Sequence, residues 1–177
     1  LLRILLRGSA TFETVILKLI QIPTELKHPK GFANSLSNQR KIRSYEVEEC
    51  WYNRFNDSVV LSESPTPMCL GTWQTQDGTC ILLEDLNNRG YSNRLYHCTR
   101  NNIKTVIRWL ANFHAAHLNT SAIGLWQCGT YWHLATRPDE LSEIEGTPLH
   151  TFAPFIDARL NTTRFQTIVH GDAKLAN

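Results

Sequence analysis

The chain has 177 residues, of which 42% are hydrophobic and 19% are charged, and its formal net charge is only +2. This length and balance predict one domain or two small ones with a packed core, and the mixed charge without a basic tail argues against a nucleic-acid partner. No apolar run reaches the roughly 18 residues that a membrane span needs. Five cysteines without a CxxC pair argue against a zinc site and predict reduced thiols in a cytoplasmic protein.

The chain begins with two predicted strands and a polar loop. Residues Leu1–Arg7 and Thr14–Ile20 are rich in leucine and β-branched side chains, which favours strands. Residues 8–10 (Gly-Ser-Ala) offer a turn between them. The polar stretch from about Pro23 to Asn38, with two prolines and a glycine, predicts a loop.

A helix and a hairpin are expected next. The residues Ser44–Phe55 predict a helix that Ser44 could cap, because apolar side chains recur every four residues, at Val47, Trp51 and Phe55. Residues Met68–Gln74 and Thr79–Leu83 predict two further strands. The Asp77-Gly78 pair between them is a strong hairpin signal, since both residues tolerate a positive φ.

The second half of the chain predicts mostly helix. The clearest helix spans Asn102–His117 and could be capped by Asn101 or Asn102; its apolar-leaning stripe contains Ile103, Val106, Ile107, Leu110, Phe113 and His117. The Pro-Asp-Glu sequence at 138–140 predicts a helix start, residues Thr151–Leu160 predict a helix, and Phe165–Val169 predict a short strand. This order predicts an α+β, two-lobed fold with an antiparallel sheet and a helix in the first lobe, at residues 1–86, and mostly helix in the second, at 87–177.

The stretch at the end of the chain, His170-Gly171-Asp172, is followed by Asn177 five residues after the aspartate. A carboxylate can accept the proton of an attacking hydroxyl, and a carboxamide oxygen can hold Mg²⁺, which are two roles that phosphoryl transfer needs side by side. The spacing equals that of the protein-kinase catalytic loop. On its own the motif is equally compatible with a turn in which Asp172 caps a helix.

Two further features accompany this motif in the order that a kinase fold requires. Lys18 lies inside an apolar strand, where lysines are rare unless they have a partner, and a kinase lysine in such a strand binds ATP phosphates and pairs with a helix glutamate. The candidates for that glutamate in the following helix are Glu46, Glu48 and Glu49. The alternatives are a lysine on an edge strand that faces water and glutamates that only favour the helix start.

The third feature is the strand that ends in Glu84, Asp85 and Leu86, followed by polar turn residues at the expected joint between the lobes. Its backbone groups could bind an adenine edge, although in isolation it is a strand followed by a turn. The aromatic residues Trp126, Tyr131 and Trp132, with His133, could form a box for a quaternary ammonium or a flat ring, or a hydrophobic plug beneath the helices.

Together these segments resemble a known group of enzymes. Gly171 in place of arginine after the histidine resembles the aminoglycoside phosphotransferase and choline kinase superfamily. The segments LLEDLNNRGY (82–91), WLANFHAAHL (109–118) and VHGDAKLAN (169–177) together resemble its ecdysteroid-kinase-like branch.

The resemblance implies a protein-kinase-like fold and an ATP- and Mg²⁺-dependent kinase that phosphorylates a hydroxyl of a small molecule. It implies Asp172 as the base, Asn177 as a Mg²⁺ ligand, and a structural role for His170, which braces the loop, and for His114. It further implies that Lys18 holds the α- and β-phosphates and that Glu48, three residues before an aromatic pair, is its partner. The nucleotide hinge is expected at Glu84, Asp85 and Leu86.

The resemblance also implies two missing parts, a nucleotide-covering loop before Leu1 and a second Mg²⁺-binding aspartate after Asn177. We therefore expect the sequence to be a fragment, truncated at both ends and of low activity and solubility by itself. A pseudokinase that binds a nucleotide or a partner without turnover is the alternative. A metal-dependent hydrolase built on His170 and Asp172 is a weaker third reading, because the other histidines do not form a recognised ligand set. The oligomeric state and the acceptor stay open.

Overall fold

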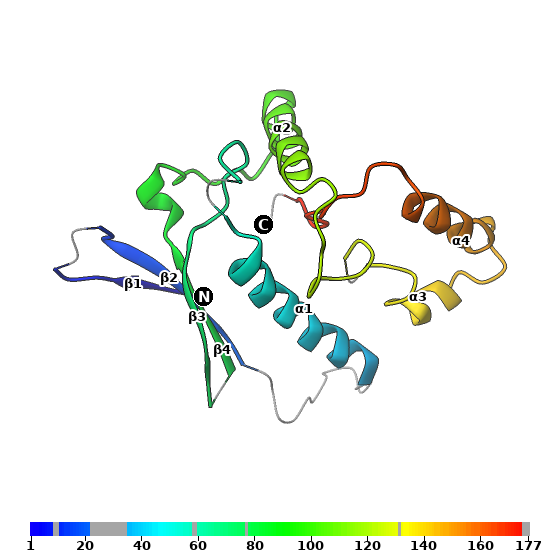
Figure 1. Cartoon of the computed structure of the whole chain (residues 1–177), viewed down its shortest axis with the longest axis horizontal. Coiled ribbons are helices and arrows are strands. Elements are labelled where there is room, and N and C mark those ends of the chain that lie inside the picture. Colours follow the sequence, from blue (N-terminus) through cyan, green and yellow to red (C-terminus); the bar gives the residue numbers. More distant parts are fainter. Residues whose placement is uncertain (9–10, 22–34, 58–59, 77, 131, 175–177) are drawn as a thin grey trace.

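The computed structural model describes residues 1–8, 11–21, 35–57, 60–76, 78–130 and 132–174, with the backbone alone at residues 35–37. A β-sheet with one long helix beside it forms one part, and helices joined by long loops form the other (Figure 1). This arrangement confirms the predicted α+β class and agrees with a kinase-like two-lobed fold. Within the described residues, none of the helices combines the length and the hydrophobicity that a membrane span requires.

The sheet is fully antiparallel, and its strand order is β1-β2-β4-β3. Its strands are β1 (Leu2–Leu5), β2 (Thr14–Ile20), β3 (Cys69–Thr75) and β4 (Gly78–Glu84). The four strand predictions are confirmed to within one or two residues at most ends. In the central pair, Lys18 of β2 lies opposite Ile81 of β4. The predicted turns involve residues 9–10 and Asp77, which lie outside the described residues.

Helix α1 (Ser35–Arg54) is longer than predicted. The prediction of a loop up to Asn38 and of a helix start at Ser44 was wrong. The hydroxyl of Ser44 instead donates a hydrogen bond to the carbonyl of Lys41 inside the helix, at 2.7 Å. The physical reason is that residues 39–43 (Gln-Arg-Lys-Ile-Arg) are mostly strong helix formers, which extend the helix toward its N-terminus without an apolar stripe. Residues 22–34 of the predicted loop lie outside the described part of the chain.

Helix α1 packs on one face of the sheet. The core there contains Ile20, Ile81 and Leu83, and α1 contributes Tyr45 and Tyr52 to it. Alternate residues of a strand point to the same face, so the β2 residue two positions before Ile20, Lys18, also faces α1. The sheet therefore presents a lysine to the helix from within an apolar surface.

The remaining elements follow the sheet. They are the short 3₁₀ helix η1 (Leu86–Arg89), α2 (Arg100–Ala116), α3 (Pro138–Ser142) and α4 (Pro148–Asn161). The prediction that an asparagine caps α2 was wrong, because the Thr99 side chain accepts the N–H of Asn102 and the Asn102 side chain accepts the N–H of Thr99. The strand predicted at Phe165–Val169 was also wrong: a single bridge, between Leu118 and Thr167, forms there.

The apolar stripe of α2 is only partly buried. Phe113 is 3% exposed and lies next to the equally buried His117, whereas Ile103 and Ile107 are about half exposed. The buried end of the stripe lies against Trp51 of α1, whose ring centroid is 5.3 Å from that of Phe113. The C-terminal turn of α2 thus joins the helical part to α1, close to the residues predicted to act in chemistry.

Candidate functional site

Lys18 and Glu48 form an ion pair between β2 and α1. The Lys18 Nζ lies 2.6 Å from both carboxylate oxygens of Glu48, and each side chain is 29% exposed. The other two candidate glutamates have different partners, since Glu46 accepts from Arg43 and Glu49 accepts from Gln74. Of the three, Glu48 is therefore the one that the fold brings to the strand lysine.

The surroundings of this pair are apolar and aromatic. Tyr52 lies one turn after Glu48 on the same side of α1. Burial, followed by the negative charge of Glu48, raises the pKa of Tyr52 to about 12, so its hydroxyl stays neutral at physiological pH. A charged pair held beside a neutral phenol and the sheet core keeps Lys18 fixed in one orientation, from which an ammonium group can meet an anionic ligand.

The end of β4 carries two buried carboxylates, Glu84 and Asp85, each 3% exposed. The Glu84 side chain accepts hydrogen bonds from the Met68 N–H at 2.7 Å and from the Arg89 guanidinium at 2.8 Å. Asp85 pairs with Arg3 at 2.6 Å. Both side chains therefore stabilise the sheet and the segment that connects the two parts of the molecule.

Asp85 is held in its charged form by its partners. Burial opposes ionisation, but hydrogen bonds from the Asn87 N–H, the Thr14 hydroxyl and Arg3 outweigh it and hold the pKa of Asp85 below its ordinary value. The same side chain caps η1 through Asn87. Asp85 therefore links β1, β2 and the joint between the two parts of the molecule.

Several backbone groups of the expected nucleotide hinge already have partners within the chain. The Glu84 N–H donates to the Met68 carbonyl, the Asp85 carbonyl accepts from Asn88, and the Leu86 carbonyl accepts from Tyr91. An adenine ring would have to use other groups of this segment or the second lone pair of a carbonyl. The role of Glu84, Asp85 and Leu86 in nucleotide binding therefore stays a prediction.

The His170–Asp172 segment makes a tight turn at Gly171. Gly171 has a φ of +74°, and a Cβ built there would lie 1.7 Å from Cγ2 of Thr130. Only glycine combines this left-handed backbone with so close an approach. The turn brings the Asp172 N–H to 3.3 Å from the Nδ1 of His170, and Lys174 Nζ lies 2.8 Å from Oδ2 of Asp172.

The His170 side chain supports this turn by packing against α2. Its ring lies edge-on to Trp109 and Phe113 of α2, at centroid distances of 5.8 and 6.4 Å. Desolvation lowers the pKa of His170, while the charge of Asp172 raises it and His114 lowers it further, with a net shift downward. Because Nδ1 accepts the Asp172 N–H, the neutral ring carries its proton on Nε2. A neutral imidazole thus positions the backbone of the loop that carries Asp172.

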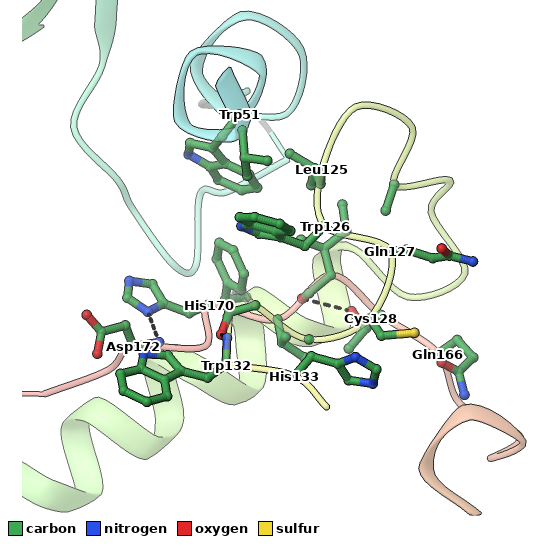
Figure 2. Close-up of a pocket in the computed structure, with 18 of the residues that line it drawn as sticks. Trp51, Leu125, Trp126, Gln127, Cys128, Trp132, His133, Gln166, His170 and Asp172 are labelled. Carbon is green, nitrogen blue, oxygen red and sulfur yellow. Dashed lines mark hydrogen bonds between the residues drawn. The ribbon is translucent and has the colours of Figure 1, made fainter. Parts of the chain in front are cut away.

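One pocket brings these groups together. It has a volume of about 810 Å³, and its lining includes Glu48 from α1 and both His170 and Asp172 from the end of the chain. Figure 2 shows the side chain of Trp51 extending from α1 toward Trp126, with His170 and Asp172 on a coil segment across the pocket. Residues that are more than 120 positions apart in the sequence therefore share one cavity.

The aromatic residues predicted in the second half line the same pocket. Trp126, Trp132 and His133 belong to its wall, and the Trp132 side chain is largely exposed, at 62%. Tyr131 lies outside the described residues. The carboxylate Asp157, which sequence reasoning missed, also lines the pocket.

Asp157 accepts a hydrogen bond from Nε2 of His133 at 2.7 Å, and Nδ1 of His133 accepts the Ala135 N–H at 3.1 Å. These two bonds fix one tautomer of the imidazole. No local sequence signal marks Asp157, because it is one of several polar residues in α4 and only the fold places it beside a histidine 24 residues earlier.

The structure brings together Glu48, His170 and Asp172 at the pocket, whereas Lys18 lies outside its lining and is paired with Glu48. It places Glu84, Asp85 and Leu86 at the joint, outside the pocket lining. Asn177 lies outside the described residues. In the part of the chain that the structure describes, no three or more His, Cys, Asp or Glu side chains form a ready metal-binding group.

Comparison with known proteins gives one match. Residues 6–123 match the ecdysteroid kinase-like family, and searches among curated proteins and among solved structures found no match. The matched residues include Lys18, Glu48 and the segment 84–86, whereas the turn at His170–Asp172 follows them. Because the match covers more than half of the 177 residues, the chain belongs to the ecdysteroid kinase-like family, whose membership points to a kinase-like phosphotransferase.

Proposed function

We propose that this protein is an ATP- and Mg²⁺-dependent phosphotransferase that moves the γ-phosphate of ATP to a hydroxyl group of a small molecule. The observation that carries the proposal is the pocket of about 810 Å³ whose wall includes both Glu48, the partner of Lys18, and Asp172. A phosphotransferase needs a cation for the nucleotide phosphates and a carboxylate for the acceptor hydroxyl at one cavity. The predicted lobes, residues 1–86 and 87–177, would supply one group each.

On this proposal Lys18 binds the nucleotide phosphates, and Glu48 holds the lysine side chain in the required orientation. The fixed position matters because phosphoryl transfer depends mainly on positioning and on electrostatic stabilisation. The 2.6 Å distances to both oxygens of Glu48 support this role, since they restrict the lysine to one direction. Glu84, Asp85 and Leu86 remain our proposal for the segment next to the adenine.

Asp172 acts as the general base. It removes the proton from the acceptor hydroxyl, whose oxygen forms a bond to the γ-phosphorus, while the bond from that phosphorus to the bridging oxygen of the β-phosphate breaks and ADP leaves. His170 holds the Asp172 backbone in the turn through the 3.3 Å hydrogen bond. The acceptor occupies the part of the pocket that Trp126, Trp132 and His133 line.

Mg²⁺ prefers carboxylate and carboxamide oxygens as ligands, and the sequence motif contains one of each, at Asp172 and Asn177. We propose that the carboxamide oxygen of Asn177 is one such ligand, as the motif implies. When bound, the ion neutralises negative charge on the β- and γ-phosphates. The chain itself contributes the orientation of the acceptor and a proton acceptor at Asp172.

The test measures acceptor-dependent ADP release from Mg-ATP with a panel of small-molecule alcohols. We expect Asp172→Asn to lower turnover by about 10²- to 10⁴-fold, the usual contribution of a general base. Glu145→Gln, a change at an exposed carboxylate on a loop outside the pocket, serves as the control and should leave turnover unchanged. Turnover that survives Asp172→Asn would contradict the assignment of the base. ATP binding without turnover on any alcohol would support the binding-module alternative.

A further inference from the structure

The outer face of α1 is tied along most of its length to the segment at residues 122–140. The residues that make these contacts are spaced by three, seven and four positions, which places them on one side of a helix. They are Arg40, Arg43, Cys50 and Arg54. Tyr45, Glu48 and Tyr52 lie on the other side, toward the sheet. Helix α1 therefore links the two parts of the molecule, as its central place in Figure 1 also shows.

Arg40 makes the most enclosed of these contacts. Its side chain is 10% exposed. It donates a hydrogen bond to the Thr136 carbonyl at 2.7 Å, and it pairs with Glu140 at 3.2 Å and with Asp139 at 3.9 Å. A nearly buried guanidinium is tolerated when it has such partners, and it fixes their relative positions because its donors are rigid. Arg40 thus joins the first half of α1 to the start of α3.

Arg43 holds the other end of the segment. It donates to the carbonyls of Gly124 and Leu125, at 3.0 and 3.3 Å, and lies 6.0 Å from the ring centroid of Trp126. Gly124 has a φ of +96°, and a Cβ built there would lie 2.5 Å from the Sγ of Cys50. The segment and the helix therefore touch without room for a side chain between them.

The segment at residues 122–140, which contacts α1, also forms part of the pocket wall. Trp126 and His133 line the pocket. Arg43 holds Leu125, which directly precedes Trp126, and Arg40 holds Thr136, which follows His133 by three residues. Glu48 follows Arg43 by five residues on the same helix. A shift of α1 against this wall would therefore also move Glu48 relative to Lys18, because a helix of 20 residues moves as a rigid rod.

We propose that Arg40 and Arg43 are positioning residues, which use the acceptor-side wall of the pocket as an anchor and hold α1 where Glu48 pairs with Lys18. The inference rests on the proposed function, since it assigns to the Lys18–Glu48 pair a role in binding ATP. Neither arginine lines the pocket of about 810 Å³. Their effect on ATP is exerted only through Glu48, and this restriction separates a positioning role from a general contribution to folding.

The experiment is a double-mutant cycle on the Kd of Mg-ATP, measured by titration calorimetry. The variants are Arg40→Gln/Arg43→Gln, Glu48→Gln, and the combination of all three. The control, Arg108→Gln/Arg159→Gln, removes two exposed arginines from α2 and α4. We expect the first variant to weaken binding roughly 5- to 20-fold, within the usual range of coupling between sites, and to have less than a twofold effect when Glu48 is already glutamine. The control should match the unaltered protein.

An unchanged Kd of Mg-ATP in Arg40→Gln/Arg43→Gln would overturn the inference. It would also be overturned if the two arginine substitutions weakened binding equally in the protein with Glu48 and in the Glu48→Gln variant. If the unaltered protein does not bind Mg-ATP, the proposed function fails and the inference fails with it. If Glu48→Gln weakens binding while the arginine variant does not, only the inference fails. Circular dichroism establishes that each variant is folded. Should the double arginine variant not fold, Arg43→Gln alone carries the same comparison, because Arg43 is 40% exposed and is less central to the fold.

Discussion

Replacing Gly171 by alanine should destabilise the turn that carries Asp172 by an amount that two separate effects determine. The first is the left-handed backbone, with φ at +74°, which costs a residue with a Cβ about 1–2 kcal/mol. The second is the contact with Thr130, since the new Cβ would lie 1.7 Å from its Cγ2. An extra methyl group that collides with a neighbouring side chain typically costs about 1–3 kcal/mol. The sum is about 2–5 kcal/mol of the free energy of unfolding.

Gly146→Ala is the matched control for the backbone effect. Gly146 has a φ of +79°, and a Cβ built there meets nothing within 4 Å, so only the first cost of about 1–2 kcal/mol applies. Thr130→Ser isolates the second effect, because it removes Cγ2 but keeps the hydroxyl that accepts the Trp132 N–H. Combined with Gly171→Ala, it should reduce the loss to nearly that of Gly146→Ala.

The assay is urea unfolding followed by circular dichroism, with the free energy of unfolding extrapolated to water. We predict that Gly171→Ala loses more free energy of unfolding than either Gly146→Ala or the combined Gly171→Ala/Thr130→Ser variant. An equal loss for Gly171→Ala and Gly146→Ala would refute it, because the turn would then have room for a side chain beside Thr130. A Thr130→Ser change that fails to recover stability would refute the assigned contact.

Two further predictions concern buried polar groups. Burial lowers the pKa of His117 below its ordinary 6.5. The native state therefore resists protonation of this histidine, whereas the unfolded chain does not. The free energy of unfolding should not depend on His117 above pH 6.5, and it should fall as the pH drops below 6.5. His117→Phe should reduce that fall when melting temperatures are compared between pH 5 and 7, and an unchanged slope would contradict the reasoning. Arg89→Met leaves the buried carboxylate of Glu84 with the hydrogen bond from the Met68 N–H and should cost about 1–3 kcal/mol in urea unfolding. A loss below about 0.5 kcal/mol would show that water replaces the arginine.

The sequence predicted the strands well because their pattern is local. In β2 and β4, β-branched and leucine side chains recur over seven residues, and polar turn residues surround them. The start of α1 was missed because its first turns are polar. There the helix is held by the hydrogen bonds and ion pairs of Arg40, and no apolar stripe marks it in the sequence. The cap of α2 was visible in principle, since Thr99 and Asn102 have the spacing of a capping box.

Some residues of the candidate site could likewise be predicted from the sequence, and others could not. Lys18 and Asp172 stand out in the sequence, because one is a charge in an apolar strand and the other belongs to a motif with fixed spacing. The choice of Glu48 among its neighbours rested on the resemblance, and the geometry of the ion pair now agrees with it. Asp157 and the contacts of Arg40 could not be predicted, because each depends on how distant segments pack and no local pattern encodes that packing.

The central claim is the proposal that Lys18, held in place by Glu48, binds the phosphates of ATP, and titration calorimetry with Mg-ATP tests it most directly. The account predicts that the unaltered protein binds Mg-ATP and that Lys18→Met weakens binding at least about tenfold, the loss of one charge-assisted contact. Lys104→Met, at an exposed position of α2, should bind as the unaltered protein does. Equal affinity for the Lys18→Met and unaltered chains, or no binding by the unaltered protein, would contradict the account.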